Sequence, residues 1–272
     1  MTQFIGITRE RVFSPGRVED DAAILRLVAE RLRALGEPVS VLDGDDERWP
    51  EPTPDAVVFT MCQGVRALQT LRRWEARGVR VINPSRGILN CQRHRTIAAL
   101  AQTDVPFPES LVVETHTEVA WPAWVDGGDV WVKRGDVHAT DAEDVTKVNG
   151  LAAARVALQR FCARGIRRAE LQRHASGTVL KFYAVRGRFF SCSSPRDGTE
   201  GFADVLQRVD AVGQRAARIL NLEVYGGDCV VGVNGALTLI DLNDWPSYAP
   251  CRTAAAGEIA AYVRAPEAAT ET

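Results

Sequence analysis

The stretch Leu237–Tyr248 reads LTLIDLNDWPSY and places two oxygen-bearing side chains at the end of a short apolar run. The run Thr238–Ile240 consists of residues that favour extended structure, so it predicts a buried strand. Asp241 and Asn243 stand one residue apart, and both side chains therefore leave the same face of an extended backbone. The pattern predicts a strand that delivers a carboxylate and an amide to one point.

A second carboxylate, Asp228, precedes this stretch in the segment GGDCVVGVNG. That segment predicts a partner strand followed by a tight turn at Asn234-Gly235. An antiparallel hairpin would bring Asp228 beside Asp241 and Asn243. Two carboxylates and an amide suit Mg²⁺, which prefers oxygen ligands and usually shares them with phosphates. The hairpin is therefore predicted to be the metal corner of a nucleotide site, although Asp and Asn are also common turn formers.

The composition is that of an ordinary globular chain. It has 272 residues, enough for two or three small domains, with 46% apolar and 25% charged residues. The net charge of −2 gives no indication of a nucleic-acid or anionic-membrane partner. No apolar run reaches the length of a membrane span, and the N-terminus lacks a signal-peptide pattern. Six scattered cysteines without a CxxC motif argue against zinc and for free thiols in a reducing cytoplasm.

Residues 1–88 predict a compact α/β domain with a parallel sheet, because short apolar strands alternate with amphipathic helices. Strands are expected at residues 4–8, 39–42, 56–60 and 79–82. Helices are expected at residues 65–77 and at residues up to 35, the latter capped by Asp20 or Asp21. No GxGxxG or GxxxxGK[ST] motif occurs here, which removes support for dinucleotide or P-loop binding.

From residue 90 onward the pattern changes to mixed strands and helices. Helices are predicted at residues 91–102, 151–162, 201–220 and 253–264, and the tail 265–272 is expected to fray. Strands are predicted at residues 111–113, at 130–133 and in the Leu237 hairpin, with a polar loop over 134–148. Residues 170–174, 178–185 and 188–192 are predicted to form an antiparallel meander joined at Ser176-Gly177 and Gly187.

The order of these segments resembles the ATP-grasp superfamily over about the last two thirds of the chain. The matching pieces are INPSRGILNCQRHRTIAALAQTDVPFPES, WVKRGD, ELQRHASGTVLKFYAV and GGDCVVGVNGALTLIDLNDWPSY. The ATP-binding domain of glutathione synthetase is similar, as are the ribosomal-protein glutamate ligase and inositol tetrakisphosphate kinase branches at the metal site. The resemblance implies an α/β N-terminal domain plus an α+β ATP-grasp module, whose two subdomains grip ATP. It implies a lid subdomain over residues 89–175 and a C-terminal subdomain over residues 176–272.

The resemblance also implies roles for single residues. Asp228, Asp241 and Asn243 match the family's magnesium ligands, and Lys181 matches the basic residue facing the transferred phosphoryl group. The remaining matches are to nucleotide-binding positions, namely Arg93, Lys133, Glu170, Leu171, Gln172 and His174. Arg93 stands where the family usually has lysine. The loop after Lys133 has Gly135 alone where relatives have several glycines, and Arg134 and His138 are candidate substitutes.

Phosphoryl transfer independently requires such residues, because it depends on positioning and on neutralising phosphate charge. The leading hypothesis is an ATP- and Mg²⁺-dependent ligase that joins a carboxylate to an amine or a thiol through an acyl phosphate. Its partners would be small-molecule carboxylate and amine substrates, and a homodimer is an assembly that the resemblance allows. A small-molecule kinase of the same fold is one alternative, favoured by the Asp/Asp/Asn set. A non-catalytic nucleotide-binding protein is the other, favoured by the glycine-poor loop.

Each of these residues also has an ordinary structural explanation. Lys133, Lys181 and Arg93 alone would most often be surface charges, and Trp245 is predicted to pack beneath the Asn243 loop. Cys62 follows the third strand, at the end of a sheet where α/β domains bind ligands, yet a single cysteine there is usually structural. The loop after the first strand holds a further three candidates for contact with an anionic substrate, Arg9, Ser14 and Arg17.

Overall fold

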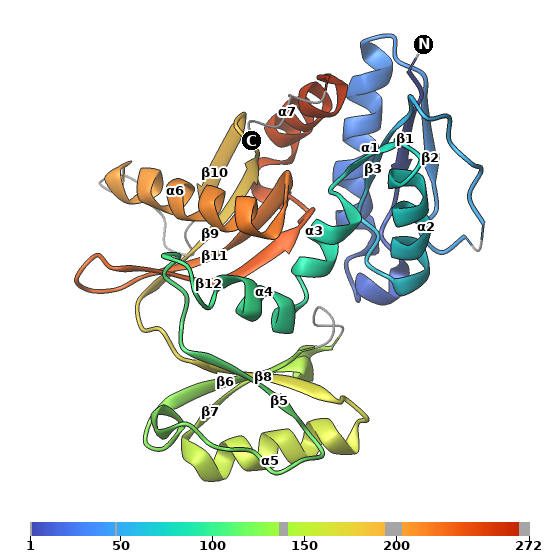
Figure 1. Cartoon of the computed structure of the whole chain (residues 1–272). Coiled ribbons are helices and arrows are strands. Elements are labelled where there is room, and N and C mark those ends of the chain that lie inside the picture. The colour runs from blue at the N-terminus through green and yellow to red at the C-terminus, as the bar shows by residue number, and fades with distance from the viewer. Residues whose placement is uncertain (1, 47, 136–140, 194–202, 267–272) are drawn as a thin grey trace.

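The structure contains three four-stranded sheets that occupy different parts of the molecule (Figure 1). It is a computed structural model that describes residues 2–46, 48–135, 141–193 and 203–266. This combination of an α/β sheet with two mixed α+β layers is the expected fold class. Within the described ranges, no helix combines the length and apolar character needed to cross a membrane.

The N-terminal sheet is parallel, with strand order β2-β1-β3-β4. Its two helices cover opposite faces, since α1 and α2 belong to separate apolar clusters. The helix α1 begins at Val18 without a side-chain cap, so the expected cap at Asp20 or Asp21 is wrong; Asp21 lies in the first turn. The elements are β1 (Phe4–Ile7), α1 (Val18–Ala34), β2 (Val39–Leu42), β3 (Val57–Thr60), α2 (Val65–Glu75) and β4 (Arg80–Ile82).

The middle sheet is antiparallel, with strand order β5-β8-β6-β7, and α5 covers one of its faces. Its edge strand β7 lies in the segment predicted to be a loop, so that prediction is wrong. The reason is local: β-branched residues of VTKVN favour extended structure although polar residues surround them. The elements are β5 (Ser110–Glu114), β6 (Asp129–Arg134), β7 (Val145–Asn149), α5 (Gly150–Ala163) and β8 (Arg168–Arg173).

The third sheet has strand order β10-β9-β11-β12 and packs against α6. The predicted meander is only partly right, because β9 pairs with β10 whereas β8 belongs to the middle sheet. Gly177 marks the crossing between sheets: its φ is 152°, and a Cβ there would lie 2.1 Å from the Val231 carbonyl oxygen. The elements are β9 (Thr178–Val185), β10 (Phe189–Ser193), α6 (Ala203–Leu220), β11 (Val224–Val231), β12 (Leu237–Asp244) and α7 (Arg252–Arg264).

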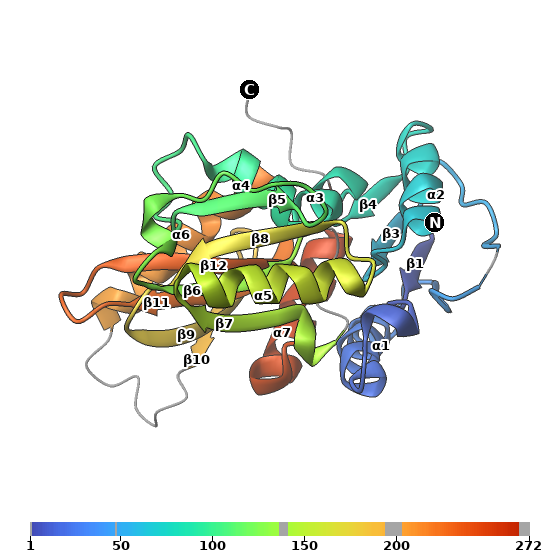
Figure 2. The same cartoon turned by 90° about the horizontal axis from the view of Figure 1, so that it is seen from below.

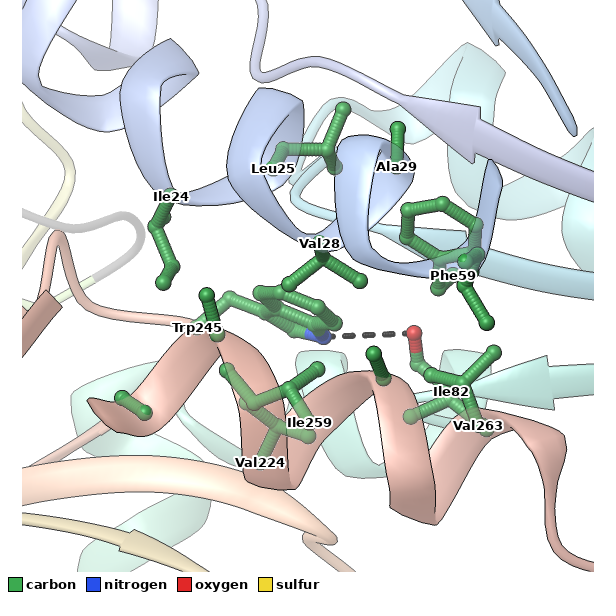
Figure 3. Close-up of a cluster of buried hydrophobic side chains, with 14 of the residues drawn as sticks. Ile24, Leu25, Val28, Ala29, Phe59, Ile82, Val224, Trp245, Ile259 and Val263 are labelled. Atoms are coloured by element: carbon green, nitrogen blue, oxygen red, sulfur yellow. Dashed lines mark hydrogen bonds between the residues drawn. The ribbon is translucent and has the colours of Figure 1, made fainter. Parts of the chain in front are cut away.

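The C-terminal helix α7 packs on α1 of the N-terminal domain and thereby joins the first and third sheets (Figure 1). Trp245, directly after β12, is fully buried in the shared core, as expected. Its indole Nε1 donates a hydrogen bond to the Ile82 carbonyl oxygen at 3.2 Å (Figure 3). Asn83 adds a second link, donating through Nδ2 to the Val224 carbonyl oxygen at 2.7 Å.

The middle sheet lies across the third sheet and meets it through polar contacts (Figure 2). Two short helices, α3 (Ser85–Asn90) and α4 (Arg93–Leu100), lead from the N-terminal sheet into it. Only the second of these helices was predicted. At its N-terminus, the Arg93 guanidinium donates to the Arg134 carbonyl oxygen at 3.0 Å. The middle sheet is therefore held over the rest of the molecule by hydrogen bonds, whereas the other two sheets share an apolar core.

Replacing Trp245 with Phe should lower the free energy of unfolding by about 2 kcal/mol, because a buried carbonyl loses its donor and the core loses contact. Urea denaturation measures the change. Trp121→Phe is the matched control, since Trp121 is only half-buried. Equal stability of the two variants would contradict the assigned role of Trp245.

Candidate functional site

The hairpin β11–β12 places Asp228 directly opposite Asp241, as predicted from the sequence. On the other side of β11, Lys181 of β9 pairs with Asp228, and its Nζ donates to the Asp228 carboxylate at 2.9 and 3.1 Å. Asn243 lies opposite Gly226, two residues beyond Asp241 on β12. All four predicted side chains line one hollow of about 360 Å³.

The paired carboxylates create a site suited to a divalent cation. Burial raises the pKa of Asp228, the facing Asp241 raises it further, and Lys181 opposes the rise. A cation between the two carboxylates would remove their mutual repulsion. With Asn243 the set is entirely oxygen, which fits Mg²⁺ and leaves coordination positions for phosphate or water.

A second group of predicted residues lies on the facing side of the middle sheet. Lys133 of β6 is buried, and its Nζ donates to Gln172 Oε1 at 2.8 Å. It also donates across the interface to the Ile240 carbonyl oxygen, at 3.4 Å, one residue before Asp241. Gln172 donates to the Glu170 carboxylate at 3.0 Å. Lys133 is thus buried and anchored next to β12, whereas an isolated lysine at such a position would most often be a surface charge.

Glu170 is the acidic partner of two buried cations at this interface. Its carboxylate lies 3.6 Å from Arg93 Nε and 3.9 Å from Lys133 Nζ, distances of ion pairs longer than hydrogen bonds. Arg93 Nε is buried and makes no hydrogen bond. Burial raises the pKa of Glu170, while Lys133 and Arg93 oppose that rise. The arrangement leaves positive charge incompletely compensated where a polyanion would meet it.

Two other predicted residues lie away from this cluster. The Leu171 side chain is buried in the core beneath α5, on the opposite face of β8, so only its backbone is on offer. His174 follows the end of β8 and accepts a hydrogen bond through Nδ1 from the Trp131 indole at 3.1 Å. Burial lowers the pKa of His174, and the ring lines a different hollow with Asp129 and Arg173.

The loop after β1 forms the opposite wall of the 360 Å³ hollow, but its candidates play different parts. Arg9 is committed internally: it pairs with Asp21 at 3.2 Å and donates to the Trp245 carbonyl oxygen at 2.7 Å. Ser14 donates to the same Asp21 carboxylate at 2.8 Å. Arg17 is exposed on the rim, and the structure gives its side chain no hydrogen bond or ion pair with another described residue.

Cys62 and Arg134 have structural partners. Cys62 is fully buried, its thiol contacts the Thr8 carbonyl oxygen at 3.2 Å, and burial holds the pKa of the thiol well above its ordinary value. It is therefore an inert core residue. Arg134 lies 3.7 Å from the buried Asp144 carboxylate. His138 lies outside the described residues.

The sequence did not single out Gln63 or Asp244, which tie the two walls together. Gln63, just after β3, donates from Nε2 to the Asp244 carboxylate at 3.1 Å, and both residues line the hollow. Asp244 follows Asn243 at the end of β12 and is fully buried. The acidic pattern DLND could have pointed to Asp244 from the sequence. No sequence pattern marks Gln63, because its role depends on a tertiary contact with Asp244.

We compared the chain with known protein families, curated proteins and solved structures. No protein-family model and no curated protein matches the sequence. Solved structures do match over nearly the whole chain. A D-alanine–D-alanine ligase from Bacillus anthracis complexed with ATP has a TM-score of 0.71 at 11% identity, covering 94% of this chain and 92% of that one. The chain has the ATP-grasp fold.

Other ATP-grasp structures agree as closely. A RimK domain protein from Sphaerobacter thermophilus has a TM-score of 0.70 at 19% identity, covering 96% of this chain and 100% of that one. D-cycloserine synthetase DcsG has a TM-score of 0.68 at 16% identity, covering the same shares. At these identities the comparisons establish the ATP-grasp fold, including the N-terminal domain, and not the roles of single residues.

Replacing Glu170 with Gln should lower the free energy of unfolding by about 3 kcal/mol, because Lys133 and Arg93 would lose their buried counter-charge. An anion in the cleft would replace that charge, so inorganic triphosphate should raise the melting temperature of the variant more than that of the wild type. Thermal denaturation with and without triphosphate tests this. Glu109→Gln, which removes an exposed partner of Arg173, is the control.

Proposed function

We propose that this protein is an ATP- and Mg²⁺-dependent ligase that forms ADP while joining a carboxylate to an amine or a thiol. The observation that carries the proposal is the convergence on one hollow of Lys181, Asp228, Asp241 and Asn243, and Arg93 lines the same hollow. Buried Lys133 of β6 donates to the carbonyl oxygen of Ile240, which precedes Asp241 on β12. The ATP-grasp ligases of similar structure support the same reaction class.

Residues of the middle sheet and of the third sheet would bind different parts of the nucleotide. Lys133 and Arg93 would neutralise phosphates entering between the middle and third sheets, where Glu170 already holds both cations in place. Glu170 and Gln172, on the same face of β8, would lie toward the rest of the nucleotide. Bound Mg²⁺, held by Asp228, Asp241 and Asn243, would offset charge on the phosphates and orient them.

The chain's own residues would then position the reacting groups. Lys181 lies at the open end of the row, half-exposed, so its ammonium can exchange the Asp228 carboxylate for a phosphoryl oxygen. The substrate carboxylate would attack the γ-phosphorus, giving an acyl phosphate and ADP. An amine would then attack the acyl carbon and release phosphate, with its proton passing to water or to phosphate. Neither step requires a protein nucleophile, and catalysis rests on placement and charge.

The reaction class is tested by supplying ATP, Mg²⁺ and paired panels of carboxylic acids and amines. ADP and inorganic phosphate should form in equal amounts, and hydroxylamine in place of the amine should trap the acyl phosphate as a hydroxamate. A stable phosphorylated hydroxyl product without phosphate release would identify a kinase instead. ATP binding with no ADP formation across the panels would identify a nucleotide-binding protein without catalysis.

The metal assignment predicts opposite effects of Asp241→Asn on stability and on nucleotide binding. Removing one of two facing carboxylates should leave the free energy of unfolding unchanged or higher, because repulsion is relieved and Leu242 N keeps an oxygen acceptor. Mg²⁺-dependent ATP binding, measured by calorimetry, should weaken at least about tenfold. Asp104→Ala, at an exposed position away from the hollow, is the control. Undiminished Mg²⁺-dependent binding would refute the assigned ligands.

A further inference from the structure

A second hollow adjoins the candidate site on the N-terminal domain. It measures about 520 Å³ and is lined by the loops after β1 and β2 and by the start of α2. Phe13 lines both this hollow and the 360 Å³ hollow of the candidate site. The consecutive residues Gln63 and Gly64 face one hollow each. The two hollows therefore lie on either side of one narrow ridge.

The position of the ridge in the sheet is that of a ligand-binding crevice. From β1 the chain crosses to β2 on one side, and from β3 it crosses to β4 on the other. The strand order of this parallel sheet therefore reverses between β1 and β3. Loops leaving the carboxyl ends of such neighbouring strands diverge and open a crevice where α/β proteins bind ligands. The ridge consists of the loops after these two strands.

The ridge is rigid enough to position a bound molecule. The buried Glu10 carboxylate, from the loop after β1, accepts hydrogen bonds from the backbone nitrogens of Gln63 at 3.0 Å and Gly64 at 2.9 Å. A Cβ at Gly64 would lie 2.7 Å from Glu10 Oε1, so a larger residue there would displace the Glu10 carboxylate. Both carboxylate oxygens of Glu10 thus bind the second loop, so Glu10 is not available to a ligand.

The far hollow offers exposed apolar side chains within a lining that carries charges of both signs. Val12 is 63% exposed and Val65 is 69% exposed, and both line this hollow. Large apolar side chains exposed beside a candidate site indicate a binding surface. Arg66, the next residue on α2, is exposed there, and the structure gives its side chain no hydrogen bond or ion pair with another described residue.

We propose that the carboxylate substrate is a peptide-like acid that spans both hollows. Its reacting carboxylate lies by Lys181, its chain crosses the ridge at Phe13, and an apolar side chain rests on Val12 and Val65. A terminal carboxylate beyond that side chain pairs with Arg66. The proposal rests on the ligase function proposed above and specifies its substrate as longer than a single amino acid.

The test measures binding of defined probes to the full chain in the presence of Mg²⁺ and a non-hydrolysable ATP analogue. The probes are acetylated glutamyl-alanyl-leucine, its C-terminal amide, its glycine counterpart in place of leucine, and acetylglutamate alone. The wild type should bind the leucine acid most tightly. The double substitution Val12→Ser and Val65→Ser should weaken that binding about tenfold and leave acetylglutamate unaffected. Arg66→Gln should weaken binding of the acid and not of the amide.

Val233→Ser, at an exposed position in the turn between β11 and β12, is the matched control and should bind like the wild type. The proposal is overturned if the wild type binds none of the tripeptides, if leucine and glycine probes bind equally, or if the valine variant binds like the wild type. Titration with ATP in the same buffer separates this from the proposed function. Nucleotide binding without peptide preference refutes the second hollow alone, and absence of nucleotide binding refutes the ligase.

Discussion

The buried contact between Trp245 and Ile82 sets the geometry on which the candidate site depends. β12 carries Asp241 and Asn243 and runs directly into Trp245, whose side chain is fixed in the core shared with α1 and α7. Arg9 reinforces the junction by donating to carbonyl oxygens of both Asp244 and Trp245. The strand β12 and the N-terminal domain are therefore joined through a buried contact. Any substrate held by the loops after β1 and β3 is placed at a fixed distance from Lys181 and Asp228.

The middle sheet is attached by a different kind of interaction. Its contacts with the rest of the chain include hydrogen bonds to backbone carbonyls, from Lys133 to Ile240 and between Arg93 and Arg134. Such bonds contribute little net free energy, because water can replace either partner, whereas an apolar core cannot open without exposing its surface. Opening the polar interface would therefore cost less free energy than opening the Trp245 core. The difference follows from the chemistry of the two interfaces.

The sequence predicted those parts of the site that depend on short-range pattern. Asp228 faces Asp241 across the predicted hairpin, where a β-bulge between Asp228 and Cys229 shifts the register, and Lys133 lies on an apolar strand as expected. The strand β7 was missed because its polar flanks resemble a loop. The pairing of β8 with β9 was mispredicted because Gly177 favours a turn as readily as a crossing between sheets. The second wall of the site was weakly anticipated, since Arg9, Ser14 and Asp21 acquire their roles from contacts between distant segments.

The charge pattern around the site shows how cations are held there in a chain of net negative charge. Each cation has an acidic partner: Glu170 lies beyond hydrogen-bond distance of Lys133 Nζ and Arg93 Nε, and Asp228, which accepts from Lys181, is also repelled by Asp241. Full neutralisation within the protein would leave nothing for a ligand to gain. Partial neutralisation holds each side chain in its rotamer. A polyanion and a divalent cation bound together would supply the remaining electrostatic stabilisation. Preorganisation of this kind favours binding both ions over binding either alone, because each adds the charge that the other requires.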